Sequence, residues 1–447
     1  HAHKSLTLVI VSRSPQGLQR HLSELELWCY NNFLSLSPSK SEVMIFGSTS
    51  PGAFPRFIMN GNDLRVVEKF KYVGVTFTST HRDIFDDFYS AKARAARSCA
   101  HGVLGTERIV GRGRLPAKCC QELYTALVDC HLISGAEIVR DVSKDGIELL
   151  VKEQVMFLRR MLGLSSKSIT TPLFTETGLR PIRIRRAILA LSYLKYLLQL
   201  PLGHYARTAI ESSFALRQDN SPSWVSDLDL VLRRLPGNEV RQLFLPQRTD
   251  LCALTIDGLV KEIRRVSSEH LLSEINSFHR LSLLRGRIEP IDPNSDDKPS
   301  SPVLRFRHYL HRVSNHRHRR SLTRLLAGNV SPFIFHCSPG RSYMEGDNVD
   351  SKQCRLCRST FETPEHVMLS CRSAGDIVLL RREFLQSNHL DPDAQRSCNH
   401  VFELLRGLIF SWELVPATAK FVHECLIIWK DTCNIPRIDE CYEDERE

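Results

Sequence analysis

The sequence predicts a predominantly α-helical protein with a small α/β region over residues 1–80. Three observations support this fold class. Before Thr80, short β-rich runs alternate with turn residues, and after it apolar residues recur every three or four positions. The 447 residues are 42% hydrophobic and 25% charged, a composition typical of globular proteins that argues against wholesale disorder or a fibrous repeat.

The first eighty residues show both periodicities. Leu6–Val11 is a short apolar run that favours a strand, and Pro15–Phe33 carries its apolar residues at helical spacing. Asn60-Gly61 lies between two apolar runs and is a strong hairpin signal. We expect Phe70–Phe77 to complete a small set of strands.

After Thr80 the pattern is helical. Apolar residues from Ile147 to Leu162 step along one face and Gly163 follows as a stop, while Ile182–Leu200 predicts a second helix. Pro290–Pro302 has the composition of a linker. The expected segments are 1–80 (α/β), 81–290 (helical), 300–350 (basic), 351–372 (Cys/His-rich) and 373–447 (helices and an acidic tail).

No apolar run reaches the roughly 18 to 20 residues that a bilayer span needs. The chain opens on His1-Ala2-His3-Lys4, which is not a secretory signal. We therefore expect an intracellular protein of the cytoplasm and/or nucleus with no membrane partner. Most of its 14 cysteines should then be reduced thiols.

One group of cysteines has the spacing of metal ligands. Cys354, Cys357, His366 and Cys371 form a C-x2-C-x8-H-x4-C pattern. Two thiolates on a tight turn can reach one side of a zinc ion, and the returning histidine and third thiolate can complete a tetrahedron. The pattern predicts a structural Zn²⁺ site; the alternative is four coincidentally spaced residues in a reduced protein.

The net charge of +10 suggests a polyanionic partner, and the excess is concentrated in one place. Residues 301–330 contain seven arginines, four histidines and no acid. This segment predicts contacts with RNA and/or DNA, whereas the alternative is a solvated helix face. The candidate contact residues are Arg305, Arg307, Arg312, Arg317, Arg319 and Arg320.

Several segments together resemble the C-terminal part (palm end, thumb and zinc knuckle) of a LINE-type, non-LTR retrotransposon reverse transcriptase. They are LTLVIVSRSPQGLQRHL (6–22), LSPSKSEVMIFG (36–47), FKYVGVTFTST (70–80), FLRRMLGLSSKS (157–168), ETGLRPIRIRRAILAL (176–191) and the run from RRSLTRLLAG (319–328) through the Cys/His pattern. The resemblance implies a palm remnant (1–80), a helical thumb and linker (81–290), a basic arm (300–350), a CCHC knuckle (351–372) and C-terminal helices (373–447).

The resemblance also implies roles for three residues of the first segment. Lys40 matches a lysine near the nucleotide in the fourth palm motif, where it stabilises phosphate charge; the alternative is a surface lysine. Tyr72 and Gly74 fall in the primer-grip match, where a tight strand pair holds the primer backbone; the alternative is an ordinary hairpin. We favour hairpin core for Val73 and Val75.

The catalytic aspartates of that family should lie immediately before Leu6, where this sequence reads His1-Ala2-His3-Lys4-Ser5. Polymerase chemistry needs two aspartate-bound metal ions. We therefore expect this chain alone to be inactive as an RNA-directed DNA polymerase, with Mg²⁺ relevant only if a longer chain supplies the missing palm.

The predicted function is that of a truncated or degenerate reverse transcriptase that retains a nucleic-acid-binding thumb and knuckle. The alternative is a domesticated zinc-containing protein-interaction module. We find no phosphate-binding loop and no Ser/His/Asp pattern, so no small-molecule substrate is predicted.

Overall fold

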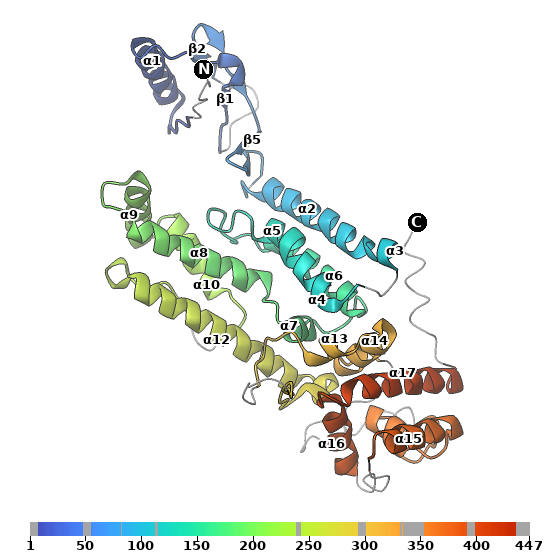
Figure 1. The fold of residues 1–447 in the computed structure, drawn as a ribbon. Helices are drawn as coiled ribbons and strands as arrows, with labels where there is room; N and C mark the ends of the chain where they lie inside the picture. The colour runs from blue at the N-terminus through green and yellow to red at the C-terminus, as the bar shows by residue number, and fades with distance from the viewer. Residues whose placement is uncertain are drawn as a thin grey trace. The chain divides into compact units, whose positions relative to one another are not determined.

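The computed structural model describes residues 8–47, 55–81, 83–111, 115–237, 243–293, 301–330, 333, 353–390 and 398–434 (Figure 1). Helices hold 61% of these residues and strands 5%, which confirms the predicted predominantly helical fold. The chain divides into two compact units, His1–Ala91 and Lys92–Glu447. Each unit is described by itself.

The first unit combines one long helix with short strands. Its elements are α1 (Pro15–Asn31), the 3-10 turn η1 (Pro38–Lys40), β1 (Glu42–Val43), β2 (Ile58–Met59), β3 (Asn62–Asp63), β4 (Arg65–Val66), β5 (Lys69–Tyr72) and β6 (Val75–Thr78). β1 pairs in parallel with β4, whereas β2–β3 and β5–β6 are antiparallel hairpins.

Helix α1 starts where the sequence offers a cap. The Ser14 side chain accepts the N–H of Gly17, and Pro15 takes the first helical position. The Gln19 side chain exchanges hydrogen bonds of 2.8 and 2.9 Å with the backbone of Ile58, which ties the helix to β2. A small core of buried apolar side chains fills the unit: Leu22, Val43, Phe57, Met59 and Leu64.

The hairpin signal at Asn60-Gly61 is confirmed, because β2 and β3 meet there with both turn residues at positive φ (48° and 72°). The strand expected at Leu6–Val11 is wrong for its described part: residues 8–11 have no strand neighbour, and Val11 is 86% exposed. The expectation of hairpin core for Val73 is also wrong, since it is 80% exposed in the β5–β6 turn; Val75 is buried as expected.

The second unit is helical. Its first elements are α2 (Asp86–Gly105), which contains the boundary between the units, α3 (Glu107–Val110), α4 (Ala117–Leu123), the π-helical turn η2 (Tyr124–Val128), α5 (Asp129–Ile133), α6 (Lys144–Leu162), α7 (Thr171–Thr177), α8 (Ile182–Gln199), α9 (Tyr205–Gln218) and α10 (Trp224–Arg233). There follow η3 (Arg248–Asp250), α12 (Ala253–Ser277), η4 (His279–Leu284), α13 (His308–Arg312), α14 (His316–Leu326), the π-helical turn η6 (His366–Ser370), α15 (Gly375–Ser387), α16 (Cys398–Ile409) and α17 (Val415–Thr432).

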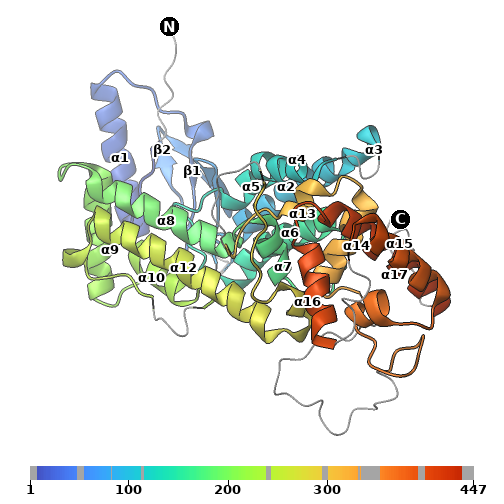
Figure 2. The ribbon, with the colours of Figure 1, turned by 60° about the horizontal axis from the view of Figure 1, so that its bottom comes forward.

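Two of the predicted helices are present with their expected ends. α6 begins at the Ser143 cap and stops at Gly163, whose φ of 68° is left-handed. α8 ends at Gln199, just before Pro201. Figures 1 and 2 show α8 lying alongside α12, and apolar side chains of α8, α9, α10 and α12 form one core.

The C-terminal part of this unit forms around α17. α14 and α15 both pack on it, and the rings of Phe384 and Phe421 stack at 4.4 Å between α15 and α17. The described residues 301–330 of the predicted basic arm contain α13 and α14, which both pack on α17. Within the linker Pro290–Pro302, residues 294–300 lie outside the described residues, as do most of 331–352 and the acidic tail.

Among the helices that the structure describes, none combines the length and apolar character needed to cross a bilayer.

Candidate metal centre, ion network and basic groove

The four predicted metal ligands come together in the structure. One ligand atom from each of Cys354, Cys357, His366 and Cys371 lies within 4.8 Å of all the others. The Cys354 and Cys371 sulfurs are 4.0 Å apart, and the Cys357 sulfur is 3.3 Å from Nε2 of His366. A zinc tetrahedron with ordinary bond lengths has S···S and S···N edges of about 3.8 and about 3.6 Å, so the cluster fits a tetrahedral ion such as zinc.

A tight loop sets the first two ligands. The amide of Cys354 donates to the Thr360 carbonyl and its own carbonyl accepts from Arg358, both at 2.7 Å, while Arg358 adopts a left-handed φ of 55°. This reversal brings Cys357 back toward Cys354. The Ser359 hydroxyl donates to the Cys357 sulfur at 3.0 Å, a contact that orients and stabilises a thiolate ligand.

Of the other two ligands, His366 is the first residue of the turn η6 and Cys371 directly follows this turn. Its geometry is fixed by Arg381 of α15, whose guanidinium is buried and donates to the carbonyls of Met368 (2.7 Å) and Cys371 (2.9 Å). The Cys371 amide in turn donates to the His366 carbonyl at 2.7 Å. A single buried guanidinium therefore satisfies the carbonyls of the turn and holds His366 and Cys371 at their spacing.

The protonation preferences of the ligands differ. Burial raises the pKa of Cys354 to about 12 and also raises the pKa of Cys371. Burial acts in the same direction on Cys357, but hydrogen bonds from Ser359 bring its pKa below the usual value. Burial and the nearby Arg381 lower the pKa of His366, which keeps the ring neutral as a metal ligand requires. Without a cation, the thiols of Cys354 and Cys371 are therefore protonated at neutral pH.

The segment that carries the four ligands, residues 353–371, is called the metal module. It contacts α17 at Trp429, which is fully buried. The indole N–H donates to Glu362 at 3.0 Å, and Glu362 also accepts two hydrogen bonds from Arg355. The ring of Phe333 stacks on Trp429 with centroids 4.0 Å apart. The module is thus joined to the body through the buried Glu362 carboxylate and through the Arg355 guanidinium, which lies over the Trp429 ring at 5.3 Å.

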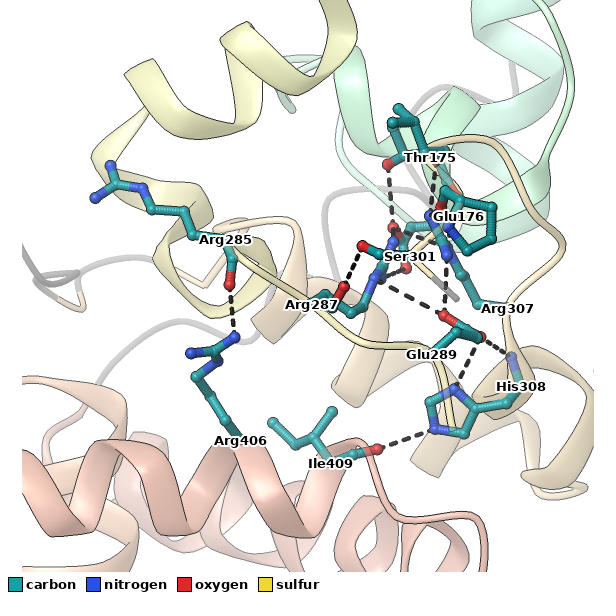
Figure 3. A network of polar contacts seen from close by, with 12 residues as sticks. Thr175, Glu176, Arg285, Arg287, Glu289, Ser301, Arg307, His308, Arg406 and Ile409 are labelled. Carbon is teal, nitrogen blue, oxygen red and sulfur yellow. Dashed lines mark hydrogen bonds and ion pairs between the residues drawn. The ribbon is translucent and has the colours of Figure 1, made fainter. Parts of the chain in front are cut away.

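A second buried polar cluster joins segments that are remote in sequence. Arg287 donates two hydrogen bonds to Glu176, which is completely buried in α7, at 2.9 and 3.0 Å. Arg307 donates to Glu289 at 2.9 Å, and the His308 ring lies between Glu289 (3.2 Å) and the Ile409 carbonyl (3.0 Å). Figure 3 shows these side chains pointing toward one another. We call this set, Glu176, Arg287, Glu289, Arg307 and His308, the ion network.

The ion network corrects one predicted contact residue. Arg307 is 2% exposed, and each of its guanidinium nitrogens donates inside the protein, to Glu289 and to the carbonyls of Thr175, Pro302 and Val303. It has no surface to offer a nucleic acid. Its acidic partners lie outside the acid-free segment 301–330, so the segment alone did not reveal them.

The other predicted arginines divide by exposure. Arg305, Arg312 and Arg317 are exposed, and Arg312 lies over the Trp412 ring. Arg319 and Arg320 are half-buried, and Arg320 donates to the Gly163 carbonyl. Lys40, Tyr72 and Gly74 lie in the first unit. Lys40 is exposed at the end of η1, Tyr72 is the last residue of β5, and Gly74 lies in the β5–β6 turn.

A concave surface lies between the start of α4 and the corner that joins α13 to α14. This cavity has a volume of about 790 Å³, and its lining includes five Lys, Arg or His residues and no carboxylate: Lys118, His311, His316, Arg317 and Arg319. We call it the basic groove. Sequence reasoning missed Lys118, because it lies some 200 residues before the arginines and only the fold brings it to them.

No protein-family model matches this chain, and no curated protein or solved structure matches it.

Proposed function

We propose that this chain is a nucleic-acid-binding protein related to the C-terminal part of a LINE-type reverse transcriptase, and that its second unit binds RNA or DNA. The observation that carries the proposal is the Cys3His centre, together with the acid-free segment 301–330 that lies upstream of it in the sequence and has exposed arginines. Small zinc modules and clustered arginines are recurrent features of nucleic-acid-binding proteins.

The metal of this centre is proposed to be zinc in a structural role. Three thiolates and one imidazole are soft and borderline ligands that suit zinc better than magnesium or calcium. All four positions of the tetrahedron are taken by protein, so no position is open for a water molecule or a substrate. The ion therefore organises the module and performs no chemistry.

Binding is proposed to depend on the exposed cations of the segment, Arg305, Arg312 and Arg317. Arginines that pair with phosphates release bound counterions, so affinity depends steeply on salt. The proposed relation to a reverse transcriptase also makes the first unit a palm remnant, in which Lys40 lies near the nucleotide and Tyr72 and Gly74 hold the primer backbone. The proposal assigns no catalytic step to this chain.

The test is fluorescence anisotropy with labelled 20-nucleotide oligo(U) and oligo(dT) at 50 and 200 mM salt. Three phosphate contacts on a single strand predict that affinity falls about 18-fold between these salt concentrations. Changing Arg305, Arg312 and Arg317 together to Gln should remove most of the affinity. The matched control changes three exposed cations elsewhere, Lys152, Lys261 and Arg264, and should bind like the wild type.

The alternative function, a zinc-containing protein-interaction module, predicts a different outcome. The protein would contain stoichiometric zinc and show no affinity for either oligonucleotide at 50 mM salt. That result would end the nucleic-acid proposal.

A further inference from the structure

We propose that the basic groove is a subsite for the phosphodiester backbone of a single nucleic-acid strand, in which Lys118 of α4 and Arg317 of α14 hold adjacent phosphates. This inference rests on the proposed function and specifies where the strand lies.

The charge of the groove is unbalanced. Its lining has cations from two separate parts of the chain, α4 and the α13–α14 corner, and no acid. Burial, followed by the charges of Arg317 and Arg319, lowers the pKa of His316, whereas the charge of Glu107 acts in the opposite direction. The two neighbouring arginines give the concavity a positive potential. A concave surface with one sign of charge focuses its field on an incoming anion.

Two of these cations, Arg319 and Lys118, are held in place before any ligand arrives. Arg319 donates from Nη1 to the Val313 carbonyl at 2.9 Å and to the Ser314 carbonyl at 3.4 Å, and the described residues provide no partner for its Nε and Nη2. Lys118 lies over the Phe306 ring at 5.2 Å. Side chains that are already ordered lose less entropy when they bind.

The start of α14 adds to the same field. Asn315 caps this helix by accepting the N–H of Arg317 at 2.9 Å, and the positive end of the helix dipole lies at the groove. Three further lining residues, Pro116, Ala117 and Leu310, are apolar and suit the sugar and the faces of the bases.

The size of the groove selects a single strand. Cavities of about 300–1,000 Å³ enclose ligands of a few hundred daltons, which is the scale of one or two nucleotides. The groove, at about 790 Å³, can take such a segment. A duplex is far too wide to enter and could only touch the rim.

The test compares two double variants of the full chain. Lys118→Gln with Arg317→Gln removes the two outermost cations of the groove, and Lys261→Gln with Arg264→Gln removes two exposed cations of α12. We expect the groove variant to bind labelled oligo(U) about tenfold more weakly at 100 mM salt, with the salt slope smaller by about 1.4, because two phosphates on a single strand are lost. The α12 variant should match the wild type within twofold, and all three proteins should share one circular-dichroism spectrum.

Crosslinking supplies an independent readout. A 4-thiouridine oligonucleotide irradiated with the wild-type protein should label peptides from both 115–123 and 308–319. The groove is the wrong site if the wild type binds but the two double variants behave alike, or if the labelled peptides lie elsewhere; the proposed function would survive both results. The affinity of the groove variant for a duplex should also be measured. If the variant loses as much affinity for the duplex as for the single strand, the single-strand assignment is overturned. If the wild type binds no oligonucleotide, both proposals fail together.

Discussion

The metal centre and the ion network are both buried polar clusters of the second unit, and they differ in how their members are spaced along the chain. The metal ligands Cys354 and Cys371 are 17 residues apart, whereas Glu176 and Arg287 are 111 residues apart. The first cluster would need an external cation to balance the charge of three thiolates, whereas the second balances its carboxylates with its own arginines. The two clusters should therefore respond to different perturbations, and each can be removed without the other.

The largest expected effect is removal of the metal. Structural zinc contributes on the order of 10 kcal/mol of apparent binding free energy in small modules, so a strong chelator should unfold the module around residues 353–371. Because Trp429 is packed against this module, its fluorescence should shift toward that of an exposed indole. The ion network should remain, since its partners are all supplied by the protein, and most of the helical circular dichroism should persist.

The control for metal removal is a pair of cysteine variants. Cys354→Ser should lose the stoichiometric zinc measured by mass spectrometry. Cys433→Ser changes a half-buried thiol outside the ligand set and should retain it. Full zinc occupancy in Cys354→Ser would contradict the ligand assignment.

The second effect is specific to the ion network. Arg307→Met keeps much of the side-chain volume but removes the arginine that donates a hydrogen bond to the buried Glu289, which should cost about 3–5 kcal/mol. Arg312→Met, five residues along the chain, changes an exposed side chain and should cost less than about 0.5 kcal/mol apart from its contact with Trp412. Thermal unfolding of the two variants measures the contrast. Zinc content should be normal in both, and equal melting temperatures would show that the ion network does not stabilise the fold.

These contrasts explain which features the sequence could reveal. The hairpin at Asn60-Gly61, the end of α6 at Gly163 and the Cys3His pattern could be predicted because each depends on residues that are close in sequence. Arg307 and Arg317 look alike in the sequence. Their different fates depend on Glu289 and on how the chain folds around it, which no local pattern contains.

The same reasoning applies to the basic groove and to the first unit. Lys118 joins the arginines only through tertiary packing, so a count of charges within 301–330 could not include it. The run Leu6–Val11 has the composition of a strand, but a strand also needs a neighbour to accept its hydrogen bonds. Residues 8–11 have none among the described residues.

The smallest of the three expected effects is a loss of stability at acid pH, when Glu289 of the ion network becomes protonated. Burial alone would raise the pKa of Glu289, but the hydrogen bond from His308 and the charges of Arg307 and Arg287 lower it to about 2. Because the pKa in the folded state lies below the usual value near 4.5, this carboxylate stabilises the fold above about pH 4.5. That contribution, about 3 kcal/mol, should be lost progressively as the pH falls from about 4.5 to about 2.

The measurement should be made in the Cys354→Ser background, so that acid release of the metal does not contribute. In that background, melting temperature should fall steeply between pH 4.5 and pH 2. Adding Glu289→Gln should lower stability at pH 7 and flatten this part of the profile, because the titrating group is gone. Glu413→Gln, a change at an exposed carboxylate, should leave the profile unaltered. An identical acid profile with and without Glu289 would show that this carboxylate is not held ionised by the ion network.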